Sequence, residues 1–155
     1  SDSALSGTLR GHVHALPLRI YFADTDAFGV VYHSRYLDYA ERGRTEMLRL
    51  LGHVHAQMME GEQASAFVVR RAEVDFRAPA RLDDLLEVRT RILAVGGATL
   101  TAEQIIHRPA DHRDLVVVII DLGCVRVDGR PRRMPADLRA TLQSLVVQAL
   151  VVQES

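Results

Sequence analysis

Six consecutive apolar residues, LVVVII at positions 115–120, limit the folds open to this chain more than any other stretch of it. Successive side chains of a β-strand point to opposite faces, so a strand of this composition needs cover on both faces of its sheet. The long amphipathic helix expected at residues 34–51 can cover one face. The other is covered either by a C-terminal helix or by a second copy of the chain. We favour the second copy, in a homodimer or homotetramer, because closed dimers are the commonest soluble oligomers.

The helix at residues 34–51 is predicted from a change of period in the sequence. Apolar or small residues recur at three- and four-residue spacing, which places them on one stripe of a helix. These residues are Tyr36, Ala40, Gly43, Met47 and Leu50. Ser34 is a typical N-cap, and Gly52 is a typical residue just past a helix end.

The remaining regular segments, apart from the last, have the pattern of strands. Alternating and β-branched residues predict strands at residues 16–22, 67–77, 85–95, 98–107 and 115–127. Gly96 and Gly97 predict a tight hairpin that uses a positive φ. A second amphipathic helix is expected at residues 135–150, with Leu138, Leu142, Leu145 and Ala149 aligned. This order predicts an α+β fold in which an antiparallel sheet of about five strands packs on the long helix.

Composition narrows the class of protein. The 155 residues suit one domain, and 48% hydrophobic with 25% charged residues is ordinary for a globular protein. We assign residues 1–15 to a flexible leader and residues 16–155 to the domain. A net charge of −1 gives no electrostatic reason to expect nucleic acid or a membrane surface as partner. The sequence contains no apolar run of about eighteen residues, so it predicts no membrane span. The single cysteine, Cys124, favours a cytoplasmic protein with a buried, inert thiol.

The polar stretch FADTDAFGVVYH, residues 22–33, directly precedes the long helix. The first N–H groups of a helix lack intrahelical partners and carry partial positive charge, so they can bind a carbonyl oxygen that is becoming an oxyanion. Asp26 and His33 would lie about 23 Å apart in an extended chain, so the loop must fold back, and we expect the reversal at Gly29. A carboxylate here suits a nucleophile or a general base acting on an acyl group. The alternative is a structural loop, because Asp and Thr often bond to nearby backbone N–H groups.

Other chemistries find little support in the sequence. It contains no G-x-S-x-G elbow, no H-E-x-x-H pair, no glycine-rich phosphate loop and no C-x-x-C pair. The two HVH triplets, residues 12–14 and 53–55, could each place two imidazoles together, but no third zinc ligand stands at a recognisable spacing. We therefore expect neither a metal nor an organic cofactor.

The stretch YFADTDAFGVVYHSRYLDYAERGRTEMLR, residues 21–49, resembles the hotdog-fold acyl-CoA thioesterases of the 4-hydroxybenzoyl-CoA thioesterase class, and most of all the branch associated with the bacterial Tol–Pal system. That branch has an acidic-Thr-Asp core, a Gly-Val-Val-Tyr-His run and a helix carrying Glu-Arg-x-Arg-Thr-Glu. These occur here at residues 24–26, 29–33 and 41–46. VDGRPRRMP, residues 127–135, is also similar to the end of the last strand in the family. Phe28 departs from the pattern, because a small residue is common there.

The resemblance implies roles for the loop residues. Asp26 matches the carboxylate that attacks the thioester carbonyl or activates a water molecule to do so. His33 stands where a backbone N–H polarises the thioester oxygen, and its imidazole is a second possible contributor. Tyr32 and Gly29 shape that entrance, whereas Asp24 matches a loop position without a part in the reaction.

Two further groups of charged residues follow from the same resemblance. Glu41 is the reserve catalytic acid, because related thioesterases place their acid on this helix. Coenzyme A carries phosphates, which arginines recognise through bidentate hydrogen bonds. Arg130, Arg132 and Arg133 therefore either bind these phosphates or form a solvated charge cluster.

The function implied by the resemblance is that of a homo-oligomeric acyl-CoA thioesterase, which hydrolyses a thioester to a carboxylic acid and free coenzyme A at a site between two subunits. A hydrolase for aromatic thioesters, or for thioesters on an acyl carrier protein, is the enzymatic alternative. The non-enzymatic alternative is a module that binds acyl-CoA without hydrolysing it. Hotdog dehydratases fit poorly, since residues 34–52 contain no histidine for their usual helix motif.

Overall fold

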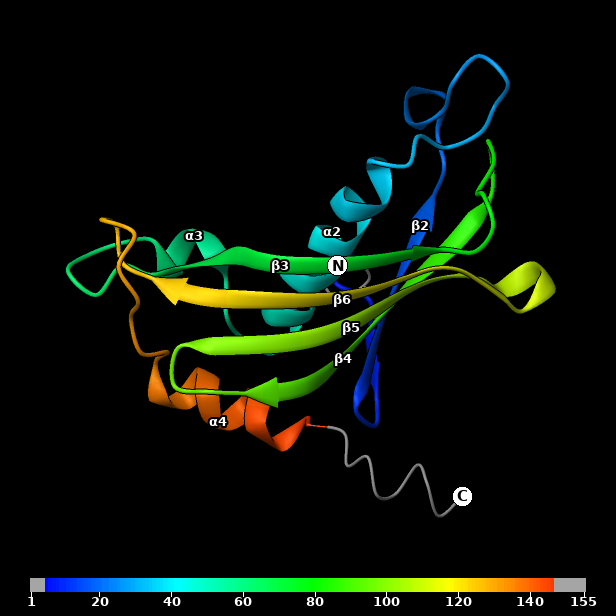
Figure 1. Ribbon diagram of the computed structural model, residues 1–155. Coiled ribbons are helices and arrows are strands. Elements are labelled where there is room, and N and C mark those ends of the chain that lie inside the picture. Colours follow the sequence, from blue (N-terminus) through cyan, green and yellow to red (C-terminus); the bar gives the residue numbers. More distant parts are fainter. Residues whose placement is uncertain (1–4, 147–155) are drawn as a thin grey trace.

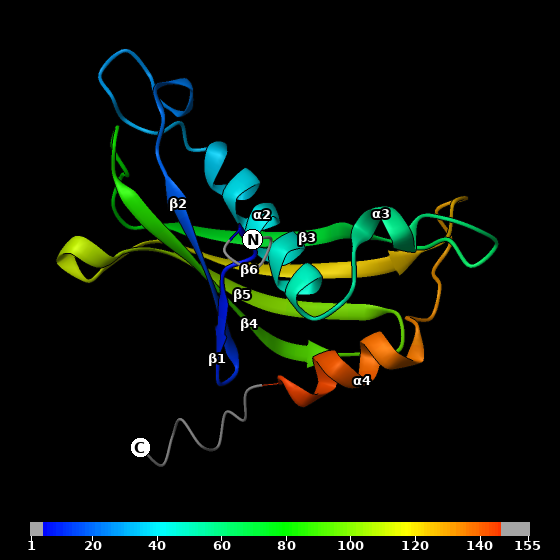
Figure 2. The ribbon, with the colours of Figure 1, turned by 180° about the vertical axis from the view of Figure 1, so that it is seen from behind.

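The computed structural model describes residues 5–146 of the chain and confirms the α+β architecture. Within these residues, six antiparallel strands form one sheet in the order β1-β2-β4-β5-β6-β3, one strand more than expected (Figure 1). The long helix α2 lies across the inner face of this sheet, behind it in Figure 1 and in front of it in Figure 2. The elements are β1 (Thr8–Arg10), β2 (Val13–Arg19), η1 (Phe22–Asp24), α2 (Arg35–Leu50), α3 (His55–Met58), β3 (Ala66–Phe76), β4 (Leu85–Val95), β5 (Thr99–Arg108), η2 (Pro109–Asp111), β6 (Arg113–Val125) and α4 (Ala136–Ser144).

The expected long helix is confirmed, and it packs unusually close to the sheet at Gly43. A Cβ atom on Gly43 would lie 2.6 Å from Cγ1 of Val88 in β4, so only glycine fits there. The close approach allows the fully buried Gln104 of β5 to donate hydrogen bonds to the carbonyl oxygen of Ala40 (2.7 Å) and to Oγ1 of Thr90 (2.9 Å). Both bonds satisfy a polar group that would otherwise be costly to bury.

The two ends of α2 differ in how well they match the sequence prediction. Gly52 has φ +93° and its N–H bonds to the carbonyl of Arg49, as expected for the residue just past a helix end. Ser34 precedes the helix, but its side chain makes no capping bond, because its backbone is already helical (φ −71°, ψ −21°). The N-cap prediction was therefore wrong in its mechanism.

The hairpin between β4 and β5 forms where Gly96 and Gly97 predicted it, but for another reason. Neither glycine is among the described residues with positive φ. A Cβ on Gly96 would instead lie 2.3 Å from Oγ1 of Thr99, so a side chain there would force the Thr99 hydroxyl to move, whereas no left-handed backbone is involved.

The N-terminal segment differs from the expected leader. Residues 8–15 form β1 and the start of β2, and residues 1–4 lie outside the described part of the chain. Arg10 pairs with Val13 across a two-residue turn whose first residue, Gly11, has φ +61°, the geometry that a Gly-first hairpin turn requires. His14 and Ala15 are buried, so this segment belongs to the folded domain, and the first long strand ends at Arg19 rather than at residue 22.

The C-terminal helix α4 packs near the end of β4 and leaves the outer face of the sheet open. Leu138 and Leu142 of α4 and Leu145 just past its end are buried, as expected, while residues 147–150, including the predicted Ala149, lie outside the described residues. In Figure 1 no helix of residues 5–146 crosses the outer face, where Val117 and Ile119 of β6 are half-buried. No helix in this part of the chain is long and apolar enough to cross a membrane.

His14 is a titratable group enclosed in the core. Its Nε2 lies 2.6 Å from the carbonyl oxygen of Ser6, which can only accept, so Nε2 is the donor of this bond. Its Nδ1 is buried and finds no hydrogen-bond partner among residues 5–146. Burial lowers the pKa of His14, although the Ser6 carbonyl and the nearby Glu46 carboxylate oppose that shift.

We predict a pH-dependent stability that arises from His14. At high pH the imidazole is neutral in both states, but below its ordinary pKa of about 6.5 the unfolded chain takes up a proton that the folded chain resists, so the free energy of unfolding falls. Thermal unfolding should show a steeper drop in Tm from pH 7.5 to pH 5 for wild type than for His14→Gln. His12→Gln, at the exposed turn, should keep the wild-type slope. Equal slopes for wild type and His14→Gln would contradict this.

Candidate functional site

The loop that contains Asp26 folds back on itself before α2, with the reversal at Gly29 as expected. The N–H of Asp26 bonds to the carbonyl of Val30 (2.9 Å), and Gly29 has φ +76°. Oδ1 of Asp26 accepts the N–H groups of Phe28 (2.9 Å) and Val30 (3.1 Å). Oδ2 accepts no hydrogen bond within residues 5–146, so one carboxylate oxygen is fixed by the loop and the other is available to a ligand.

A backbone segment at residues 80–82 joins this loop to the first turn of α2. The N–H of Val31 donates to the carbonyl of Ala80 (3.0 Å), and the N–H of Leu82 donates to the carbonyl of Gly29 (2.9 Å). The hydroxyl of Tyr36, in the first turn of α2, accepts the N–H of Ala80 (2.9 Å). The loop, the segment and the helix entrance therefore form one hydrogen-bonded unit.

The helix entrance presents a free donor next to a cavity. The N–H of His33 has no acceptor within the described chain, whereas the neighbouring N–H of Tyr32 bonds to the carbonyl of Asp24 (3.2 Å). The exposed His33 ring packs edge-on against Phe76 of β3, with 6.4 Å between ring centroids. His33 and Phe76 line a cavity of about 330 Å³ together with Val31, Tyr36, Arg77, Ala78 and Pro79.

Asp24 occupies a structural position, as its loop assignment suggested. Its Oδ2 accepts the N–H of Tyr21 (2.9 Å) at the start of η1, and its carbonyl holds Tyr32. Burial and the charge of Asp24 raise the pKa of the Tyr39 hydroxyl, which keeps that phenol protonated near neutral pH.

Aromatic side chains around the loop are exposed to an extent unusual for apolar residues. Phe28 is 89% exposed, and Tyr21, Phe22 and the predicted substrate-binding residue Tyr32 are exposed beside it. Exposed apolar clusters of this kind mark surfaces that bind a ligand or another protein. In the sequence Phe28 departs from the pattern of the family, but its exposure is a feature that the sequence alone does not indicate.

The predicted phosphate-binding arginines lie at the other end of the sheet. Arg130 is exposed with its Nε 4.0 Å from Asp128, Arg132 donates to Gln63, and Arg133 lies against Gly97. Their segment follows Val125, which pairs with Ala66 at the start of β3, whereas His33 packs on Phe76 at its end. Ten residue steps along a strand span about 33 Å, so one copy of the chain does not bring these arginines to Asp26.

A second cavity, of about 310 Å³, lies between α2 and the inner face of the sheet. The reserve acid Glu41 lines it, as does Arg44, whose Nη1 donates to Oε1 of Gln104 (3.0 Å). Burial lowers the pKa of Arg44. The remaining walls are Met47, Leu48, Phe67, Val69, Ile92, Leu100, Ala102 and Leu122. Arg44 was missed in the sequence, where its one signal was the polar Gln104 in an otherwise apolar row of β5.

The remaining reactive side chains are not arranged as a site. His12 and His14 fall in an exposed turn and in the core, and no group of three or more His, Cys, Asp or Glu residues within residues 5–146 could hold a metal ion. Cys124 is buried, and burial raises the pKa of its thiol, which agrees with the expected inert cysteine.

Comparison with known proteins places the chain among thioesterases. The model of the Thioesterase-like superfamily matches residues 20–142. The chain is 40% identical to the Acyl-CoA thioesterase YbgC of Haemophilus influenzae over 84% of this chain and 95% of that protein. It is 41% identical to the Acyl-CoA thioester hydrolase YbgC of Escherichia coli over 80% and 91%. The crystal structure of a probable thioesterase from Bartonella henselae is similar with a TM-score of 0.75 at 40% identity, covering 79% of this chain and 99% of that one.

The positive φ at Gly29 generates a prediction about the loop. An alanine there would meet only Cβ of Leu82, at 3.7 Å, so its cost is conformational rather than steric. We expect Gly29→Ala to lower the free energy of unfolding by about 1 kcal/mol, and Gly29→Asn by less, because Asn tolerates left-handed backbone better. Urea unfolding of the three proteins measures this, and equal losses for Ala and Asn would contradict it.

Proposed function

The chain belongs to the Thioesterase-like superfamily and is an acyl-CoA thioester hydrolase of hotdog fold, and we propose that Asp26 carries its chemistry at the entrance to α2. One observation supports this choice above the others. The Asp26 loop is hydrogen-bonded, through residues 80–82, to Tyr36 in the first turn of α2, and the free N–H of His33 lies just before that turn. A carboxylate and an unpaired donor are thus held at fixed relative positions.

The free N–H of His33 has the role of polarising the thioester. It donates to the carbonyl oxygen of the bound thioester, and the positive end of the helix favours the negative charge that develops there. Because this donor is part of the backbone, it needs no reorganisation during the reaction. The His33 ring contributes a wall of the adjacent cavity with Phe76.

Asp26 acts through its unengaged oxygen, Oδ2, in one of two ways. As a nucleophile, Oδ2 forms a bond to the thioester carbon while the carbon–sulfur bond breaks and coenzyme A leaves as a thiolate. Water then cleaves the resulting anhydride, which restores Asp26 and yields the carboxylic acid. As a general base, Oδ2 takes a proton from water while the water oxygen attacks the same carbon, and the proton passes to the leaving sulfur. Both routes give one carboxylic acid and one free coenzyme A.

A second copy of the chain completes the site in this proposal. Among the strands of residues 5–146, the edge strand β3 pairs only with β6, and its Val68, Val69 and Phe76 are exposed. A long exposed edge strand is a template for pairing with another chain. Antiparallel pairing of two β3 strands about a twofold axis would set the start of β3 in one copy beside its end in the other. The half-buried outer face offers a further surface for a tetramer.

This pairing accounts for the separation between Asp26 and the arginines. Arg130, Arg132 and Arg133 of one copy would approach the Asp26 loop of the other, where their guanidinium groups can bind the phosphates of coenzyme A. The cavity under α2 in the copy that supplies the arginines, about 310 Å³ in volume and mostly apolar, would take the acyl group, with Glu41 and Arg44 as its polar lining. Gly29 and Tyr32, in the Asp26 loop, would border the path between the arginines and this cavity.

The proposal also includes the group that carries the acyl chain and the cellular location of the protein. Acyl-CoA is the substrate class named for the relatives, and an aromatic acyl group or an acyl carrier protein is the alternative that uses the same residues. The same chemistry requires no metal or organic cofactor from the protein. A cytoplasmic location is favoured by the single, buried Cys124, which needs no oxidising compartment.

We predict that Asp26→Asn lowers kcat for acyl-CoA hydrolysis by at least about 10²-fold, since the amide neither attacks the carbonyl nor accepts a proton from water. The loop should persist, because Oδ1 of asparagine can still accept the N–H groups of Phe28 and Val30. Thiol release from a panel of acyl-CoAs measures the change. Asp24→Asn is the matched control and should turn over near the wild-type rate. A wild-type rate for Asp26→Asn would contradict the catalytic role of Asp26.

The shared site predicts complementation between two defective variants. Arg133→Gln should raise KM for acyl-CoA severalfold, while Arg126→Gln, which removes the neighbouring ion pair with Asp128, should not. When Arg133→Gln and Asp26→Asn chains are refolded together, mixed dimers gain one intact site that combines the wild-type Asp26 of one copy with the wild-type Arg133 of the other. Activity at low acyl-CoA should then exceed the mean of the separate variants severalfold, in dimers confirmed by sedimentation. Activity equal to that mean would contradict the shared site.

A further inference from the structure

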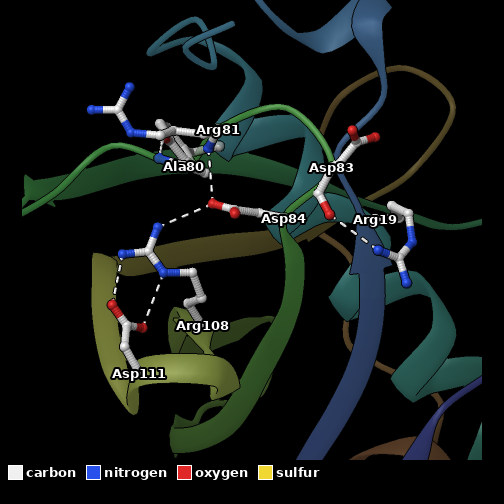
Figure 3. Close-up of polar contacts among 8 residues, drawn as sticks. Arg19, Ala80, Arg81, Asp83, Asp84, Arg108 and Asp111 are labelled. Atoms are coloured by element: carbon white, nitrogen blue, oxygen red, sulfur yellow. Dashed lines mark hydrogen bonds and ion pairs between the residues drawn. The ribbon is translucent and has the colours of Figure 1, made fainter.

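Arg108, at the end of β5, is the centre of an ion-pair network near the Asp26 loop but outside it (Figure 3). Its Nε and Nη2 bond to the two carboxylate oxygens of Asp111 in η2, at 3.0 and 2.8 Å. Its Nη1 bonds to Oδ2 of Asp84 (3.0 Å), at the start of the β4 segment. We call these three residues the Arg108 network. Only 17% of the Arg108 side chain is exposed, and the two carboxylates raise its pKa.

The Arg108 network holds one particular turn, residues 81–84. The Asp84 oxygen that accepts from Arg108 also accepts the backbone N–H of Arg81 (2.9 Å), and the N–H of Asp84 closes the turn on the carbonyl of Arg81 (3.0 Å). Asp83 within this turn has φ +69°, a backbone conformation that costs energy for a residue other than glycine. Arg19 donates to the carbonyl of Asp83 (3.0 Å) from the other side (Figure 3). Side-chain contacts therefore maintain a turn that the backbone alone disfavours.

The same turn continues into the backbone that carries the site. Leu82 bonds to Gly29, and Ala80 bonds both to Val31 and to the hydroxyl of Tyr36. A displacement of residues 80–84 would thus move the Asp26 loop relative to the first turn of α2. Because Asp26 and the N–H of His33 must meet the same thioester group, a shift well below 1 Å between them is enough to slow the reaction.

We propose that Arg108 is a positioning residue for thioester hydrolysis, which acts through Asp84 on the turn at residues 81–84 and so sets the position of Asp26 relative to the N–H of His33. This inference rests on the proposed roles of Asp26 and His33. Arg108 does not touch the substrate. Asp111 orients the guanidinium by its bidentate contact, and Asp84 transmits the restraint to the turn.

The expected kinetic signature is a loss of kcat without a matching change in KM. Arg108→Gln should lower kcat about tenfold, since a shift of 1 Å can cost about 10²-fold and a smaller one is expected here. KM should stay within about twofold, because no contact to the acyl-CoA is lost. Asp84→Asn should have the same effect, and the double variant should be no slower than the slower single variant, because both act through one link.

Arg113→Gln is the matched control for these measurements. Arg113 pairs with Arg108 across the β5–β6 ladder, is exposed, and makes no ion pair within 4 Å among the described residues. Its replacement removes the same charge from the same hairpin and should leave kcat unchanged. All assays are run well below the Tm of each variant. If Arg108→Gln does not fold, Arg108→Lys takes its place, since it keeps one charged contact but cannot hold both carboxylates, and a smaller drop in kcat is expected.

Amide hydrogen exchange provides a readout that a change of global stability would not reproduce. The N–H groups of Val31 and Leu82 should exchange faster in Arg108→Gln and Asp84→Asn, while the ladder amides of β5 and β6 keep their wild-type rates. An unchanged kcat in Arg108→Gln, or an equal loss in Arg113→Gln, would overturn the proposal while Asp26→Asn remains inactive. If Asp26→Asn is instead active, the proposed site itself fails, and the two failures are distinguishable.

Discussion

The close packing of α2 against the sheet at Gly43 is the constraint on which the rest of the molecule depends. No side chain larger than hydrogen fits there, since a Cβ would lie 2.6 Å from Val88. That contact sets the distance between helix and sheet, and the bonds of the buried Gln104 to Ala40 and Thr90 fix the helix along the sheet. With the helix fixed, the position of its first turn is fixed too, and the Tyr36 hydroxyl can meet the N–H of Ala80.

The proposed site is built from backbone groups rather than from a packed cluster of side chains. Val31, Gly29 and residues 80–82 are joined by N–H to carbonyl bonds, and the unpaired N–H of His33 is itself a backbone donor. Loops of this kind bury little apolar surface and so gain little from packing. Hydrogen bonds from the charged side chains of Arg108 and Arg19 hold the turn at residues 81–84, which supports these backbone groups. The order of the site therefore depends on residues that are distant from it in sequence.

The sequence predicted the elements whose pattern is long and regular. The helix over residues 34–51 and the strands from residue 67 onward were found within a few residues of their expected ends, because their apolar periods are strong. It missed β1, because three residues are too few to show a period and the turn at Gly11 was not read as a hairpin. At Gly96 it predicted the turn but not its cause, since steric contact with Thr99 depends on how the chain returns.

The sequence by itself determined the helix entrance, the reversal at Gly29 and the family of the chain, because these depend on residues close together and on their types. Only the tertiary structure decided which oxygen of Asp26 is free, that the arginines at residues 130–133 lie at the opposite end of β3, and that Arg108 bonds to Asp84. The free oxygen of Asp26 follows from how its loop folds back, whereas the places of the arginines and of Arg108 follow from the register of paired strands. A shift of one residue in register would change these last two, and near-neighbour patterns in the sequence do not specify that register.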